Sequence, residues 1–145
     1  MTYSVNPEIA LLIRHSGRRV LLVEDNQLNR EITQLLLSKT GLLVDTAENG
    51  HVALGLAARH AYSLIVTDLA MPGMDGVETT KKIRQLRGYE NTPVIVLTAC
   101  VLSENRDYCL NAGLNDFITK PVCVTKLYAT VLRWLDSLEE ALVPG

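Results

Sequence analysis

Five polar side chains of this 145-residue sequence each follow a short apolar run, and together they could perform chemistry. Three are the carboxylates of Glu24, Asp25 and Asp68, and the others are the hydroxyl of Thr98 and the amine of Lys120. These residues lie far apart along the chain. Only a fold that gathers the ends of several strands would bring them into one site.

Three carboxylates at neighbouring strand ends repel one another, by about 4 kcal/mol per pair at a separation of about 4 Å and an effective dielectric near 20. A cation between them relieves this repulsion. Oxygen ligands without nearby His or Cys suit Mg²⁺ or Mn²⁺ and do not suit zinc. With the Lys120 ammonium and the Thr98 hydroxyl beside the cation, the group suits phosphoryl transfer, in which a carboxylate can be the nucleophile and form an acyl phosphate.

Apolar runs that alternate with helical periodicity must position these groups. Strands are expected near 20–23, 42–44, 64–66, 94–97 and 117–119, and helices near 28–36, 52–57, 76–86, 103–112 and 122–138. Asn49 and Asp75 are expected to cap two of the helices. Five such units with near-continuous apolar strands predict a parallel sheet with helices on both faces. In such sheets, ligands bind outside the carboxyl ends of the strands, where the five polar residues fall.

The composition indicates an ordinary globular protein, with 48% hydrophobic and 21% charged residues. A net charge of -2 gives no basic surplus, so direct binding of nucleic acid is not expected. Three cysteines without a CxxC pair predict neither a disulfide scaffold nor a zinc site, and they fit a reducing, cytoplasmic compartment. The apolar run Ile9–Ile13 is too short for a signal peptide or a membrane span.

Four motifs, in chain order, resemble the receiver domain of two-component response regulators. They are Val20-Leu21-Leu22-Val23-Glu24-Asp25-Asn26, Asp68-Leu69-Ala70-Met71-Pro72-Gly73-Met74-Asp75-Gly76, Leu97-Thr98-Ala99 and Lys120-Pro121. Each motif is weak alone, but all four fall in order at the expected strand ends, and the resemblance covers roughly residues 18–138. It implies a doubly wound, flavodoxin-like fold of five strand–helix units and a role in phosphorelay signalling.

The resemblance also implies roles for individual residues. Asp68 would be phosphorylated, and Asp25, Asp68 and the backbone carbonyl of Ala70 would bind Mg²⁺ directly, with Glu24 acting mainly through water. Thr98 and Lys120 would bind the phosphoryl oxygens. Phe117 matches the aromatic switch position of the family, although a Phe on a short strand is also an ordinary core residue.

Other interpretations of the acidic edge fit less well. Metal-dependent phosphatases and nucleic-acid enzymes carry an Asp-x-Asp pair, whereas Ala70 stands two residues after Asp68 and Gln27 two after Asp25. A flavodoxin-like cofactor binder would need a phosphate loop after the first strand, where Asp25 would repel phosphate. A receiver-like binding module that works without phosphorylation stays open, but the complete Asp, Thr and Lys set argues against it.

The expected domain organisation is a receiver over residues 18–141, with an N-terminal linker or tail over 1–17 and a C-terminal tail over 142–145. An added short helix could occupy the N-terminal segment. Asn26–Arg30, Asn49-Gly50 and Cys109–Gly113 look like receivers of hybrid histidine kinases, in which case the first residues would be the linker to the kinase core. A free-standing response regulator is the alternative. In either case the expected partner is a histidine kinase or a histidine phosphotransfer domain.

Overall fold

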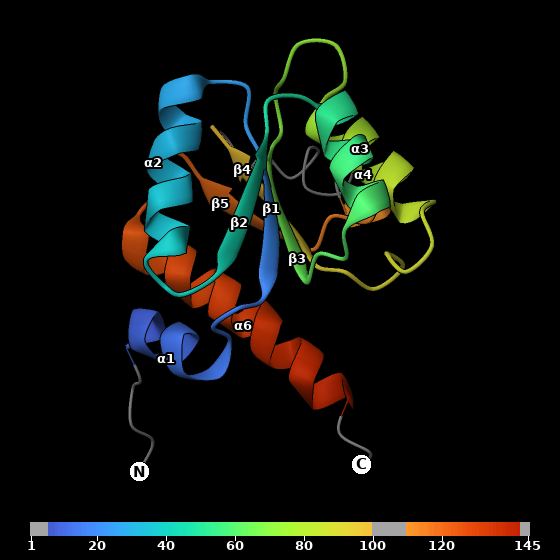
Figure 1. The fold of residues 1–145 in the computed structure, drawn as a ribbon. Coiled ribbons are helices and arrows are strands. Elements are labelled where there is room, and N and C mark those ends of the chain that lie inside the picture. The colour runs from blue at the N-terminus through green and yellow to red at the C-terminus, as the bar shows by residue number, and fades with distance from the viewer. Residues whose placement is uncertain (1–5, 100–109, 143–145) are drawn as a thin grey trace.

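The computed structural model describes residues 6–99 and 110–142, and it holds five parallel strands in one sheet (Figure 1). The strands are β1 (Arg19–Val23), β2 (Leu43–Ala47), β3 (Leu64–Asp68), β4 (Val94–Thr98) and β5 (Asp116–Thr119). Their order in the sheet is β2-β1-β3-β4-β5. The chain moves outward from β1 to β2 and then crosses back to β3, so the order reverses between β1 and β3. This confirms the predicted doubly wound arrangement.

Alternate residues of the central strands face opposite sides of the sheet, and both sides are covered. Leu21 and Ile65 pack in the layer of α3 (Gly50–Arg59) and α4 (Gly76–Arg84). Leu22 and Val66 pack in the layer of α2 (Gln27–Ser38) and α6 (Val124–Leu142). Full burial of each of these side chains stabilises the fold by about 1.5–3 kcal/mol. Burial on both faces explains why the strands are almost continuously apolar.

The helices α2, α3 and α4 begin at polar caps of the same kind. The side chains of Asn26, Asn49 and Asp75 each accept a hydrogen bond from the backbone N–H three residues later, at 2.8 to 2.9 Å. A cap of this kind stabilises a helix by about 1 kcal/mol. The predicted capping roles of Asn49 and Asp75 are confirmed.

A further helix, α1 (Pro7–Arg14), occupies the segment that the sequence left open between a linker and a short helix. Leu11 is fully buried in the same apolar cluster as residues of β1 and α6, and the side chain of His15 is buried beside α6. Residues 7–15 are therefore packed against the domain. At the other end, α6 continues to Leu142, beyond the predicted helix end at 138.

The apolar residues whose spacing predicted α2 lie mostly on its exposed side. Leu28, Ile32 and Leu35 are 64%, 49% and 63% exposed, whereas Thr33 and Leu37 form the buried side. The helix is confirmed, but much of the apolar pattern faces away from the core.

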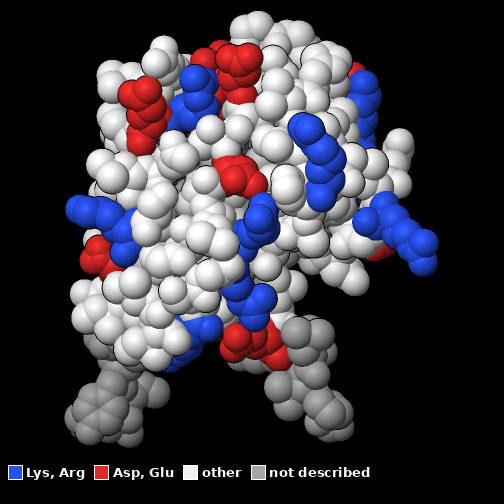
Figure 2. Space-filling view, viewed as in Figure 1, with Lys and Arg blue, Asp and Glu red and all other residues white. Residues whose placement is uncertain are grey.

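Some expectations concern residues that the structure does not describe. Most of the helix expected at 103–112 lies outside the described residues, as do Cys100 and Cys109. The remaining cysteine, Cys123, is exposed and not part of the core. None of the helices in the described part has the length and hydrophobicity needed to cross a bilayer. Basic and acidic side chains are interspersed over the face shown in Figure 2, without a continuous patch of either sign.

Candidate functional site

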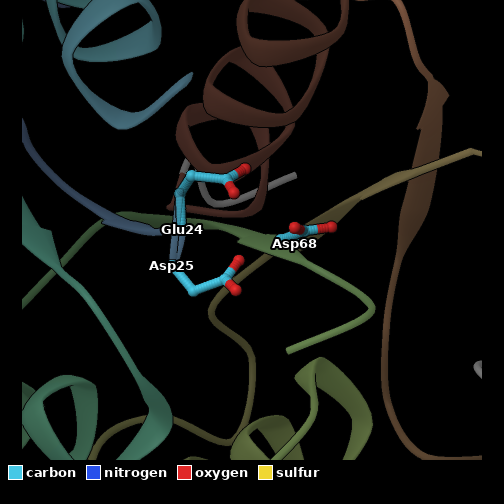
Figure 3. Close-up of side chains that lie close together, drawn as sticks. All are labelled: Glu24, Asp25 and Asp68. Atoms are coloured by element: carbon cyan, nitrogen blue, oxygen red, sulfur yellow. The ribbon is translucent and has the colours of Figure 1, made fainter. Parts of the chain in front are cut away.

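The acidic residues meet where the strand order reverses. Val23 of β1 pairs with Thr67 of β3, so Glu24 and Asp68 follow side by side at the carboxyl ends of neighbouring strands. The side chains of Glu24 and Asp25 extend from the end of β1 toward Asp68 (Figure 3), and one carboxylate oxygen from each of the three lies within 4.8 Å of the others. The structure thus brings together the three carboxylates that the sequence singled out.

Lys120 joins this cluster from the end of β5. Its Nζ atom lies 3.1 Å from Oδ2 of Asp68 and 3.5 Å from Oε2 of Glu24. The Asp68 side chain is only 8% exposed, so this ion pair is largely shielded from water. The backbone N–H of Lys120 donates to the Thr98 carbonyl at 2.8 Å, which fixes the lysine to the end of β4. One ammonium therefore faces two buried carboxylates.

The surroundings of Glu24 and Lys120 shift the pKa values of both side chains. Burial raises the pKa of Glu24 above its ordinary value, and the Asp68 charge acts in the same direction, while the Asn26 amide and Lys120 oppose it. Burial opposes the charged form of Lys120, but hydrogen bonds and charge from Asp68 and Glu24 outweigh it and raise the lysine pKa. The ammonium therefore stays charged at neutral pH.

The remaining predicted residues surround this cluster at different depths. Thr98 ends β4 and is buried, one residue beyond the pairing of Leu97 with Asp68. Ala70 lies in the loop between β3 and α4 with an exposed side chain. Phe117, on β5, is partly buried against the apolar layer of α3 and α4. The side chain of Phe117 is thus packed on the sheet in this structure.

The donor set fits a hard divalent cation. Glu24, Asp25 and Asp68 offer only oxygen atoms, and the described residues place no His or Cys in the cluster. Asp25 is exposed, and within the described residues no ion pair engages its carboxylate. Mg²⁺ takes one or two carboxylates and keeps several waters, which matches two acids at an open edge.

Two residues near the site carried no role in the sequence analysis. A Cβ atom on Gly76 would lie 2.4 Å from the backbone oxygen of Asp68, so only glycine allows α4 to start this close to the acidic residue. Arg30 donates from Nη1 to the backbone carbonyl of Glu24 at 2.9 Å. The glycine after the Asp75 cap could have suggested close packing. The role of Arg30 could not be read from the sequence in this way, because it contacts backbone atoms. Its only sequence signal is a basic residue near the start of a helix.

The sequence profile of the response regulator receiver domain matches residues 20–132. The chain belongs to this family. It is therefore a receiver domain of two-component signalling, as the four motifs predicted. The sensor protein GacS of Pseudomonas syringae pv. syringae is 33% identical over 134 residues, which cover 90% of this chain and 15% of that protein. This receiver domain thus spans a small part of the relative's length.

Solved receiver structures share the fold. The receiver domain of sensor histidine kinase PA1611 from Pseudomonas aeruginosa PAO1 is 35% identical, with a TM-score of 0.77 over 83% of this chain and 99% of that one. That structure has a magnesium ion coordinated in its active site cleft. The chemotaxis protein CheY4 of Vibrio cholerae is 30% identical, with a TM-score of 0.79 over 81% of this chain and 98% of that one. These matches confirm the predicted flavodoxin-like fold.

Proposed function

We propose that this receiver domain accepts a phosphoryl group on Asp68 from a phosphohistidine, in a Mg²⁺-dependent step of a phosphorelay. The observation that carries the proposal is the position of the Asp68 carboxylate. It lies at the switch point of the sheet, 3.1 Å from the Lys120 ammonium and within 4.8 Å of carboxylate oxygens of Glu24 and Asp25. Glu24 also contacts Lys120, but at the longer distance of 3.5 Å, so Asp68 is the carboxylate of the cluster nearest to the protein cation.

The chemistry is an exchange of one bond for another. An oxygen of the Asp68 carboxylate attacks the phosphorus of the phosphohistidine. The O–P bond forms as the N–P bond breaks, and the electron pair of the broken bond returns to the imidazole nitrogen. The Lys120 ammonium and the Thr98 hydroxyl donate hydrogen bonds to the phosphoryl oxygens, which carry the charge of the transition state.

Asp25, Asp68 and the backbone carbonyl of Ala70 would hold Mg²⁺ in this proposal, and Glu24 would act through a water molecule. The burial of Glu24 and its contacts with Lys120 and the Asn26 amide support the indirect role, because its oxygens already have protein partners. Bound there, the ion supplies positive charge that offsets the three carboxylates and the incoming phosphoryl group. Mn²⁺ has the same ligand preference and is expected to substitute.

The partner in this proposal is a histidine kinase or a histidine phosphotransfer domain that docks on α2. A groove of about 440 Å³ lies between α2 and the loop that follows β5, and its lining includes Glu24, Lys120, Ile32 and Val122. The groove thus joins the acidic cluster to the exposed apolar side of α2. An apolar helix face laid along α2 would bring a histidine on that helix to Asp68.

Phosphorylation would then act as a switch. The added charge attracts Thr98 and Lys120, and we propose that Phe117 on the adjoining strand turns further inward in response. The shift cannot exceed the difference in affinity of the phosphoryl group for the two states. The likeness to the sensor protein GacS, of which the match covers only 15%, favours a larger parent protein such as a hybrid histidine kinase, acting in the cytoplasm, over a free-standing regulator.

The test is phosphorylation by acetyl phosphate, a donor too small to need a docking surface. With Mg²⁺ the wild type should gain one phosphoryl group by intact-mass spectrometry, and Asp68→Ala should gain none. Asp45→Asn is the matched control, since Asp45 lies on the edge strand β2 away from the cluster and should leave the yield unchanged. An equal yield in Asp68→Ala would refute the assignment.

A further inference from the structure

Arg30 reaches back from the first turn of α2 to the end of β1. Its Nη1 atom donates to the Glu24 carbonyl at 2.9 Å and lies 3.5 Å from the Asp25 carbonyl. These are the backbone oxygens of two residues whose carboxylates belong to the acidic cluster. The guanidinium is partly buried, and in the described part of the chain no carboxylate pairs with it.

A cation at this position is locally unfavourable. The first turn of a helix favours negative charge, so a cation there opposes the helix dipole. The first turn of α2 carries no acidic residue to offset Arg30. A residue that opposes the helix dipole but makes backbone hydrogen bonds at a functional edge indicates a role beyond helix formation.

The segment held by Arg30 leaves the regular sheet. Pairing of β1 with β3 ends at Val23, and beyond it the Glu24 N–H still bonds to the Ala47 carbonyl at 3.0 Å. The Glu24 carbonyl, on the next peptide unit, accepts from Arg30. That peptide unit also carries the N–H of Asp25, so its orientation sets the direction in which the exposed Asp25 side chain starts.

We propose that Arg30 is a positioning residue of the cation site, which holds the Glu24–Asp25 peptide so that the Asp25 carboxylate faces Asp68 before the ion binds. The inference rests on the proposed function, because it takes the acidic cluster as the Mg²⁺ site. Two effects of Arg30 on the ion oppose each other. Its charge repels Mg²⁺, whereas its hydrogen bonds prepare the ligands.

The experiment is Mg²⁺ titration by calorimetry of wild type, Arg30→Met and Arg30→Lys. Arg30→Met removes both the charge and the hydrogen bonds, and we expect it to weaken Mg²⁺ binding roughly tenfold, as for other groups that orient ligands. Lysine keeps the charge but lacks the planar fork, so Arg30→Lys should also bind more weakly than wild type. Arg87→Met is the matched control, since exposed Arg87 follows α4 and the same loss of charge there should leave the affinity unchanged.

A second measurement needs no metal. Amide hydrogen exchange of Asp25 and Asn26 without Mg²⁺ should be faster in Arg30→Met, while the urea midpoint of unfolding stays near that of wild type. A merely structural role would lower the midpoint without this local change. Unchanged or tighter Mg²⁺ binding by Arg30→Met, beside a wild type that binds Mg²⁺, would overturn the inference alone. If the wild type binds no Mg²⁺, the metal site of the proposed function falls with it.

Discussion

The Nε2 atom of His15 lies 2.7 Å from Oδ1 of Asp136, which ties the segment entering the domain to its last helix. The His15 side chain is fully buried, and its Nδ1 atom accepts a hydrogen bond from Nε of Arg18 at 3.1 Å. Because Arg18 can only donate, a neutral His15 carries its proton on Nε2 and donates to Asp136. Arg14 also pairs with Asp136, at 2.8 Å. The ring therefore links α1, the following turn and α6 in one hydrogen-bonded network.

Loss of this network should destabilise the whole domain. We expect His15→Ala to lower the free energy of unfolding by roughly 2 kcal/mol, because it leaves a cavity and removes partners from Arg18 and Asp136. Urea unfolding measures the change. Ile13→Ala is the control on the same helix, since Ile13 is 77% exposed and its truncation should change stability by about 0.5 kcal/mol or less. Equal stability of His15→Ala and wild type would show that α1 is not part of the cooperative unit.

The two neighbouring acids at the end of β1 should differ in their effect on Mg²⁺. Asp25→Ala removes a direct ligand, so we expect Mg²⁺ affinity to fall roughly 100-fold, whereas Glu24→Ala should cost roughly tenfold because Glu24 acts through water. Calorimetric titration measures both. Glu24→Gln keeps the volume of this buried side chain and separates loss of charge from a packing defect. A larger loss for Glu24→Gln than for Asp25→Ala would reverse the ligand assignment.

Position 76 requires glycine because the start of α4 lies close to the backbone of Asp68. An added Cβ would meet the Asp68 backbone oxygen at 2.4 Å, so Gly76→Ala must displace either the start of α4 or Asp68 itself. We expect a loss of stability of about 1–3 kcal/mol and slower phosphorylation by acetyl phosphate. The control is Gly55→Ala in α3, where the nearest atom, Nη2 of Arg59, is 3.8 Å away. There alanine should stabilise the helix by up to about 1 kcal/mol, and the same sign at both positions would contradict the prediction.

The exposed side of α2 should matter for a protein donor and not for a small one. Ile32→Asp places a charge on the groove wall, and we expect phosphotransfer from a phosphohistidine protein to slow tenfold or more, a cost of about 1.4 kcal/mol. Phosphorylation by acetyl phosphate should be unchanged. Leu43→Asp, at a similarly exposed position on β2, controls for a general effect of surface charge. Equal slowing with both donors would place the defect in the site itself.

The parts of the fold that could be predicted are those that depend on residues close together in the sequence. The central strands could be predicted because burial on both faces favours an apolar residue at nearly every position, as in Val20–Val23. The Asn49 and Asp75 caps depend on residues only three positions away. The packing of α1 was left open because it depends on His15 and Asp136, which are 121 positions apart.

The candidate site likewise has contacts that could be predicted from the sequence and contacts that could not. Asp68 ends β3 and Lys120 directly follows β5, so the sequence could place both at the carboxyl edge of one parallel sheet, where the structure brings them to 3.1 Å. Arg30 and Gly76 act on backbone atoms of Glu24 and Asp68, and a backbone contact requires no complementary residue type. Such contacts become visible only in three dimensions.

The start of α1 and the end of α6 both lie toward the amino ends of the strands, on opposite sides of the molecule, while Asp68 ends β3 at the other edge of the sheet (Figure 1). Strands of five residues separate the two edges by about 16 Å. A biosensor surface, a fluorescent fusion or a covalent linker attached at the start of α1 or the end of α6 would therefore leave the acidic edge accessible. The domain can be immobilised from below and still be approached by large donors from above.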